Sequence, residues 1–264
     1  MQERIKQIDF LGLVLWIFRT AIIVAMLWGT IATLMDNPYS ARAWTDTIVA
    51  GIAQGSLYAL IAIGYTLVYG VLFMINFAHG EFFMSGIMTA TIFIAQPMSA
   101  SGYLDRHPVI GITVIAVVTM LVSVGIANLT ERIAYRPLRG APRLVPLITA
   151  IGASFFWQYF FQGLYGSEVK AFPQIEVIVG KVNIAGIEIL KSQVIVIIVT
   201  ILMLAGLYFF VVKTKTGKSI RAAAENKDVA RLMGIDVDRA ITLTFTLGAS
   251  MAGIAGVLYA LVFR

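Results

Sequence analysis

The chain has 264 residues, of which 59% are hydrophobic and only 13% are charged. Soluble domains carry about a quarter charged residues, so this composition excludes an ordinary soluble protein. A transmembrane β-barrel would alternate polar and apolar residues in segments of about 10, and the long unbroken apolar runs exclude that class too. We therefore predict an all-α, polytopic transmembrane helix bundle.

Charge and side-chain chemistry narrow the possible functions. The net charge of +6 comes from basic residues that concentrate in two loops beside apolar runs, where the positive-inside rule puts them. We therefore expect contact with membrane lipid and none with nucleic acid. The chain has no cysteine and only two histidines, His79 and His107, so we expect no disulfide, no metal site and no cofactor.

Apolar runs of spanning length predict about seven membrane helices. The first contains Arg19, which either faces the bundle or follows an interfacial segment ending at Phe18. The third run has only about 15 residues, so it is either a span that includes Asn76–Gly80 or a half-helix after a break in the membrane. The predicted spans are 10–35, 47–74, 81–95, 109–129, 144–164, 192–212 and 242–263.

The segments between the spans predict turns, a hairpin and a topology. Asn37-Pro38 marks 36–46 as a turn-rich loop, and Pro97, Gly102 and Pro108 mark 96–108 as another. β-Branched runs around two glycines predict a small external hairpin within 174–189. The arginine-rich loop 131–143 and the basic segment 213–239 are expected in the cytoplasm. The N-terminus is then cytoplasmic and the C-terminus external.

Small residues recur every four positions in two of the predicted helices. Stripes of this kind let two helices approach closely in a membrane. We therefore expect helix contacts along both stripes, which are Gly51, Gly55 and Ala59 in the second span and Gly248, Ala252 and Gly256 in the last.

The basic segment 213–239 contains a predicted helix over 219–233, rich in Ala, Arg, Glu, Leu and Met. Gly217 precedes it, and Gly234 suits the position after its C-terminus. Such a helix either lies on the membrane surface as an amphipathic element or serves as a docking helix for a cytoplasmic subunit.

The stretch 64–86 places polar groups inside an apolar environment. Such groups usually face a cavity, a partner helix or a pathway, so Asn76, His79 and Glu81 are candidates for a substrate path or gate. They could equally stabilise a broken helix, and Gly80 is expected to allow a turn or a close approach there. The fifth span adds Thr149 and Ser154, which either line the path or bond back to helix carbonyls.

Several motifs occur in an order that resembles one family. They are Gly55–Gly70, the run Ile-Asn-Phe-Ala-His-Gly-Glu at 75–81, Glu131–Arg139, Leu147–Gly152 and Gly217–Gly234. The chain is similar over about 47–261 to the LivH-type permeases, which are membrane subunits of ABC importers for branched-chain amino acids.

The resemblance implies a half-transporter of the inner or plasma membrane that works by alternating access and is not itself an enzyme. Its partners would be a second, LivM-like permease, two cytoplasmic ATPase subunits and an external or periplasmic solute-binding protein. Residues 1–46 would form an anchor helix and external loop, and 47–264 the permease domain with coupling loop 213–239. The coupling residues would be Gly217, Arg221, Ala222, Glu225, Asn226, Ala230 and Gly234.

Two departures from the family pattern leave alternatives open. The anchor at 10–35 precedes the usual start of the family, and the chain stops at Arg264, where relatives continue. We therefore expect a C-terminally truncated permease, a split gene or a partial chain. Urea or a short-chain amide is the alternative substrate, and a channel-like protein or intramembrane enzyme is the alternative class.

Overall fold

The computed structural model describes residues 10–36, 40–142, 144–184 and 187–263. Within these residues, seven helical segments are long and apolar enough to cross a membrane. The prediction of an all-α polytopic protein with about seven spans is therefore confirmed. The chain forms two compact units, 1–48 and 49–264, which are described separately.

The first unit contains α1 (Phe10–Asp36) and the first turns of α2 (Ala41–Leu72). α1 is one uninterrupted helix through Arg19. The prediction of a loop extending to residue 46 is wrong, because α2 already begins at Ala41. The Ser40 side chain accepts a hydrogen bond from the Ala43 N–H at 3.3 Å, a capping contact that favours a helix start. The predicted Asn37-Pro38 turn lies outside the described residues.

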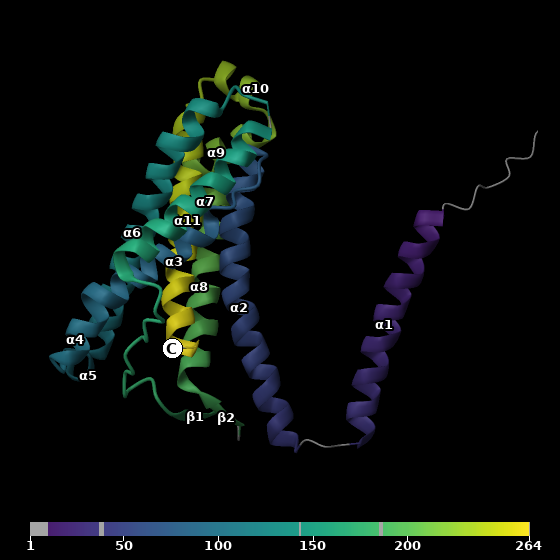
Figure 1. Ribbon diagram of the computed structural model, residues 1–264, viewed down its shortest axis with the longest axis vertical. Coiled ribbons are helices and arrows are strands. Elements are labelled where there is room, and N and C mark those ends of the chain that lie inside the picture. Colours follow the sequence, from purple (N-terminus) through teal and green to yellow (C-terminus); the bar gives the residue numbers. More distant parts are fainter. Residues whose placement is uncertain (1–9, 37–39, 143, 185–186, 264) are drawn as a thin grey trace, which may run out of the picture. The chain divides into compact units, whose positions relative to one another are not determined.

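The second unit is built around α11 (Val237–Phe263), which contacts α3 (His79–Ala90), α6 (Pro108–Thr130) and α8 (Lys191–Lys213). In its most apolar stretch 67% of α11 is buried, against 17–33% for the other spans of this unit. α11 is therefore the central helix. In Figure 1 it runs through the middle of the bundle.

The third span is longer than its apolar run suggested. After α2 ends at Leu72, a non-helical connector over 73–78 leads into α3. A π-helical turn, η1 (Thr91–Ala95), joins α3 to α4 (Gln96–Ala100), so helical structure continues from 79 to 100. The predicted loop at 96–108 is wrong in its first part, because residues 96–100 are helical. Pro97 has no N–H to donate within the helix, and the π-helical turn before it changes the hydrogen-bond pattern so that the helix continues.

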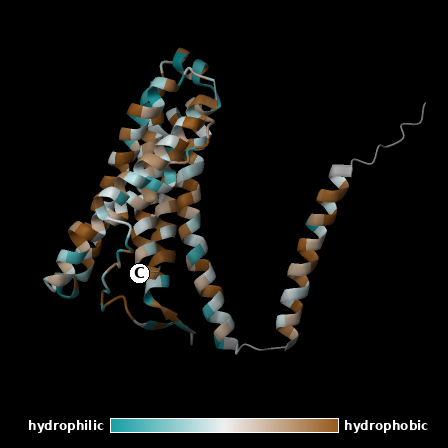
Figure 2. Cartoon of the chain, viewed as in Figure 1, coloured by the Kyte–Doolittle hydropathy of each residue, from teal (hydrophilic) through white to brown (hydrophobic). Residues whose placement is uncertain are grey.

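The remaining elements close the bundle and separate its two ends. α5 (Tyr103–Arg106) precedes α6, which continues through η2 (Glu131–Tyr135) and η3 (Arg136–Leu138) before α7 (Leu144–Tyr165). The predicted hairpin is confirmed as the antiparallel pair β1 (Lys181–Ile184) and β2 (Ile187–Leu190). In Figure 1 this pair lies at the opposite end of the bundle from α9 (Lys215–Glu225) and α10 (Lys227–Leu232). Figure 2 shows hydrophilic residues gathered at the α9–α10 end.

The two small-residue stripes behave differently. The stripe in α11 packs as predicted: a Cβ built at Gly248 would lie 2.7 Å from the Gly64 carbonyl oxygen of α2, and one at Gly256 would lie 3.3 Å from the Phe83 carbonyl oxygen. Among the described residues of 49–264, no atom lies within 4 Å of a Cβ built at Gly51 or Gly55. The predicted contact of that stripe is therefore not found within this unit.

The close contact between Gly64 and Gly248 can be tested by adding a side chain at Gly64. A Cβ at Gly64 would meet the Gly248 carbonyl oxygen at 2.8 Å, so we expect Gly64→Ala to lower the free energy of unfolding by about 1–3 kcal/mol through overpacking. The measurement is the thermal unfolding midpoint of the purified protein in detergent.

The matched control is Gly125→Ala in α6, where the described residues leave open space around the new Cβ. This substitution should be neutral or stabilising, because alanine favours a helix over glycine by about 1 kcal/mol. Equal midpoints for the two variants would contradict the proposed role of the Gly64–Gly248 contact.

Candidate functional site

The connector between α2 and α3 is held by a buried polar contact. The Asn76 side-chain oxygen accepts hydrogen bonds from the Tyr135 hydroxyl at 2.7 Å and from the Ala78 N–H at 3.1 Å. Asn76 is 1% exposed. Its amide therefore gives the irregular backbone a partner in a region without water, as buried polar groups require. This contact supports the structural reading of Asn76 and leaves a transport role as a proposal.

The next polar residues begin α3. The buried His79 ring meets the rings of Tyr65 and Phe82 edge-on, with centroids 5.7 and 6.0 Å away. Gly80 is exposed, and no described atom lies within 4 Å of a Cβ built there. The prediction of a turn or close approach at Gly80 is wrong, because the chain direction changes earlier, in the connector.

Glu81 and Ser154 are brought together although they are 73 positions apart. The Ser154 hydroxyl of α7 donates to the Glu81 carboxylate at 3.0 Å, and the pair is partly buried. Thr149 instead bonds back to the Val145 carbonyl of its own helix at 2.9 Å. Thr149 also borders an apolar cavity of about 490 Å³ between η2 and α7, which Thr130, Gly152 and Trp157 line as well.

A second polar cluster lies where η2, η3 and α11 meet. The guanidinium of Arg139 donates to the carboxylates of both Glu131 and Asp238. Glu131 is only 2% exposed and also accepts from the Thr242 hydroxyl at 3.2 Å. Arg136 adds a longer contact to Asp238, at 3.5 Å. The cluster fastens the first basic loop to the start of α11, so both basic loops lie at one end of the bundle.

The second basic segment forms two helices, so the prediction of one helix over 219–233 is wrong. Asn226 breaks the helix, because its side-chain oxygen accepts from the backbone N–H groups of Asp228 and Val229 at 3.0 and 3.1 Å. It thereby caps the N-terminus of α10, a position for which asparagine is strongly favoured.

The glycines and alanines of this segment have defined packing roles. A Cβ on Gly217 would collide with the carbonyl oxygens of Phe210 and Val211, so only glycine lets α9 turn back against the end of α8. Gly234 has φ +79°, and the N–H groups of Gly234 and Ile235 bond to the carbonyls of Arg231 and Ala230. This is the Schellman arrangement, which confirms the predicted role of Gly234.

The outer side of the helix pair carries exposed residues of two kinds. Ala230 is buried and Ala222 is partly buried against the bundle, while Arg221 and Glu225 are exposed. The exposed apolar side chains of this side are Val229, Leu232 and Met233, at 53%, 87% and 76% exposure. We name these three residues the α10 apolar patch. Such a patch next to charged residues is typical of a protein or membrane contact.

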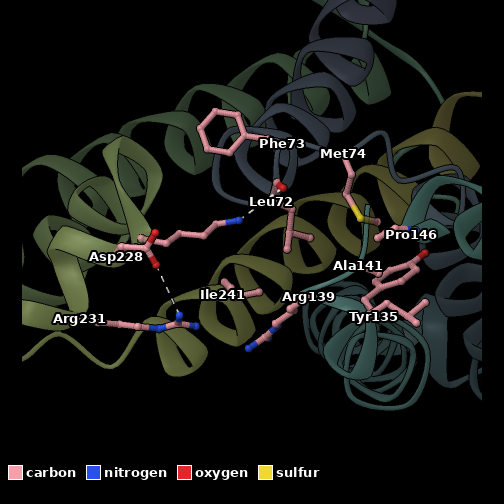
Figure 3. A pocket seen from close by; sticks show the side chains of 12 residues that line it. Leu72, Phe73, Met74, Tyr135, Arg139, Ala141, Pro146, Asp228, Arg231 and Ile241 are labelled. Carbon is pink, nitrogen blue, oxygen red and sulfur yellow. Dashed lines mark hydrogen bonds and ion pairs between the residues drawn. The ribbon is translucent and has the colours of Figure 1, made fainter. Parts of the chain in front are cut away.

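A cavity of about 350 Å³ lies between α10, the end of α2 and the first basic loop. Figure 3 shows Leu72 and Phe73 on one side of it and Asp228 and Arg231 on another. Lys227 also lines the cavity, and its pKa is lowered by burial and by the positive charges of Arg139 and Arg231. The charged form of Lys227 is therefore less favourable in this cavity than it would be in water.

Sequence reasoning missed several residues that the fold assembles. Tyr135 and Glu131 lie in the motif 131–139, which carries the family resemblance as a whole but gave neither side chain a role. Lys227 stood in the docking segment without a partner, and Asp238 directly precedes Arg239 at the end of it. Tyr135, Lys227 and Asp238 have partners 59–155 positions away in the chain, so no local pattern reveals these pairs, whereas Glu131 contacts both Arg139, eight positions away, and the distant Thr242. Among the described residues, no group of three or more His, Asp or Glu could hold a metal ion.

Comparison with known proteins identifies the family. The model of the branched-chain amino acid transport system permease component matches residues 47–264. The chain belongs to this family. It is 40% identical over 218 residues to the high-affinity branched-chain amino acid transport system permease protein BraD of Pseudomonas aeruginosa, covering 81% of this chain and 70% of BraD.

Two further relatives agree with the family. The chain is 41% identical over 215 residues to the permease protein LivH of Salmonella typhimurium and 40% identical over 214 residues to LivH of Escherichia coli K12. Each match covers 79% of this chain and 68% of the relative. No solved structure matches the chain with significance. As a family member, this chain is a multi-pass membrane permease component.

The buried carboxylate of Glu131 makes the Arg139 cluster testable. We expect Arg139→Met to lower the free energy of unfolding by about 3–5 kcal/mol, because it leaves a buried charge without its partner. The measurement is the thermal unfolding midpoint in detergent. Arg132→Met, at an exposed neighbouring position, is the control and should change little.

The double variant Glu131→Gln with Arg139→Met removes both charges and should recover part of the lost stability. If Arg139→Met unfolds at the same temperature as Arg132→Met, the cluster does not hold the loop to α11.

Proposed function

We propose that this chain is a membrane-spanning permease subunit of an ATP-driven ABC importer that translocates leucine, isoleucine and valine by alternating access. The observation that carries the proposal is the family match over 47–264, together with relatives at about 40% identity that are named for branched-chain amino acid transport. The paired helices α9 and α10 add a structural argument, since an importer needs an element that an ATPase can move.

The α10 apolar patch supports docking on a protein in preference to lying on the membrane. The patch lies beside two charged residues, Asp228 and Arg231, which are both exposed. A short helix that is capped at both ends and packed on the bundle through Ala230 is a rigid element. A rigid helix with an exposed apolar patch fits a groove on a partner protein.

The partners follow from the same proposal. ATP hydrolysis takes place on two cytoplasmic ATPase subunits, which bind α9 and α10. A LivM-like permease completes the membrane pathway, and an external solute-binding protein delivers the amino acid. The N-terminus and the α9–α10 end then face the cytoplasm, in agreement with the basic loops at that end.

Glu81 and Ser154 are the polar groups that we propose to line the path or its gate. They come from two different helices, α3 and α7, and form a partly buried pair within the spans. A carboxylate inside a membrane is costly and is usually retained for function. Its charge suits the ammonium group of an amino acid, whereas urea and short amides carry no such group.

The function is tested by uptake. Proteoliposomes with the complete transporter and its binding protein should accumulate labelled leucine only when ATP is inside, and unlabelled valine or isoleucine should compete. If labelled urea is taken up and leucine is not, the substrate is urea or a short amide instead of a branched-chain amino acid. Leucine flux without ATP would favour a channel.

The docking role of α10 makes a separate prediction. Leu232→Asp puts a charge into the α10 apolar patch, so we expect ATPase binding to weaken by about 2 kcal/mol or more, as for the central residue of an interface. The measurement is co-purification of the ATPase subunits in detergent.

The control is Val169→Asp, which adds the same charge at a highly exposed apolar residue in the segment between α7 and β1. It should leave ATPase binding unchanged. If Leu232→Asp binds the ATPase as well as Val169→Asp does, the docking assignment is wrong.

The path role of Glu81 is tested by Glu81→Gln, which keeps the shape and an acceptor for Ser154 but removes the charge. We expect leucine uptake to fall about tenfold or more with normal assembly, because hydrogen bonds to charged groups are worth about 1.5–3 kcal/mol. Ser154→Ala, which keeps the carboxylate, should have a smaller effect. Normal uptake by Glu81→Gln would remove this residue from the gate.

A further inference from the structure

The end of α2 has an unusual backbone. Phe73, directly after the helix, has φ +58°, and it is the one non-glycine residue with a positive φ in the described part of the chain. The left-handed conformation is uncommon for any residue with a side chain and is a genuine outlier for a bulky one. Glycine usually occupies such a position after a helix. The surrounding structure must therefore hold Phe73 in place.

One side chain from the helix pair reaches this point. The ammonium of Lys227 donates to the Leu72 carbonyl at 3.5 Å and lies 5.6 Å from the centroid of the Phe73 ring. The last carbonyls of a helix lack partners within the helix and carry partial negative charge. Lys227 thus supplies a cation both to the C-terminus of α2 and to the face of the aromatic ring.

The position is unfavourable for a lysine in other respects. Arg139 and Arg231 repel it and burial removes water from it, so its pKa is lowered, with only Asp228 acting in the opposite direction. The Lys227 side chain is long and flexible, and the cavity of about 350 Å³ beside it leaves room for conformations that point away from Leu72. Its backbone is fixed, however, because Lys227 is the first residue of α10 and follows the Asn226 cap.

The Leu72 carbonyl, which Lys227 binds, belongs to the last residue of α2, directly before the connector over 73–78. Phe73 begins the six residues that end at Ala78, and within them Asn76 bonds to Tyr135. His79 and Glu81 follow in the first turn of α3. A movement of Lys227 therefore acts on the connector through one residue, and the connector leads directly to the proposed path residues.

We propose that Lys227 is a positioning residue that links the ATPase-coupling helices to the α2–α3 connector by holding the C-terminus of α2 and the strained Phe73. This inference rests on the proposed function. When the ATPases move α10, Lys227 shifts relative to Leu72 and Phe73, and the connector passes to a second arrangement. Both arrangements must differ in their contacts, as any coupling element requires, and the cavity beside Lys227 leaves room for the shift.

The test uses the complete transporter in proteoliposomes and measures leucine taken up per ATP hydrolysed. We expect Lys227→Met to lower this ratio by about fivefold or more, the smallest effect typical of lost coupling between sites. Lys227→Arg keeps the cation and should retain most of the ratio. The control is Arg132→Met, which removes an exposed cation in η2, outside the coupling loop, and should couple as the unaltered protein does.

A second measurement reports the connector itself. Because the chain has no cysteine, Ile75→Cys gives a single spin-label site at an exposed connector position. We expect an ATP-dependent change in label mobility in the otherwise unaltered protein and with Arg132→Met, and loss of this change with Lys227→Met. Phe73→Asn, which suits the left-handed backbone but removes the ring, should also weaken the change and decides the matter if Lys227→Met fails to assemble.

The outcomes separate the two proposals. If the unaltered transporter shows no ATP-driven uptake, the proposed function fails. If it couples normally and Lys227→Met shows the same uptake per ATP and the same label response, only the role of Lys227 is overturned. If Lys227→Met does not assemble, an unchanged label response in the transporter with Phe73→Asn overturns the role of Lys227 as well.

Discussion

Close backbone contact along α11 is the constraint on which the second unit depends. In a membrane there is no hydrophobic gain from bringing helices together, so small residues that permit tight packing take its place. Gly248 meets Gly64 of α2, Gly253 meets Ser123 of α6, and Gly256 meets the Phe83 carbonyl of α3. One helix therefore fixes three neighbours. α11 begins at Val237, five positions after α10 ends at Leu232, so the most buried span follows the helix pair closely in the chain.

Two polar clusters of this unit lie where the helical backbone is interrupted. The connector over 73–78 exposes backbone groups that α-helices satisfy internally, and the Asn76 amide and Tyr135 hydroxyl compensate for the loss. Glu131, Arg139 and Asp238 perform a similar task where α6 passes into the first basic loop. These contacts hold the backbone of the irregular regions in the arrangement described.

Much of the fold was predictable from the chain alone. The span positions, the hairpin, the stripe in α11 and the glycine after α10 follow from local chemistry: hydrophobic length, β-branched runs, close packing and left-handed backbone. The failures have local explanations too. Pro97 did not end its helix because a π turn precedes it, and Asn226 divided a helix-forming segment because it caps α10 better than it continues α9. The sequence singled out Asn76, Glu81 and Ser154 as candidates for a path or gate, a role that stays a prediction, and it did not reveal which residues they contact.

The sequence by itself determined the membrane class, the family motifs and the two basic loops, because these properties reside in composition and in neighbouring residues. Only the tertiary structure decided that Glu81 meets Ser154, that Tyr135 meets Asn76 and that Lys227 reaches the end of α2. These pairs join residues 59–155 positions apart. Their contact depends on how whole helices pack, and the packing in turn depends on many weak interactions spread along α11, which no single motif records.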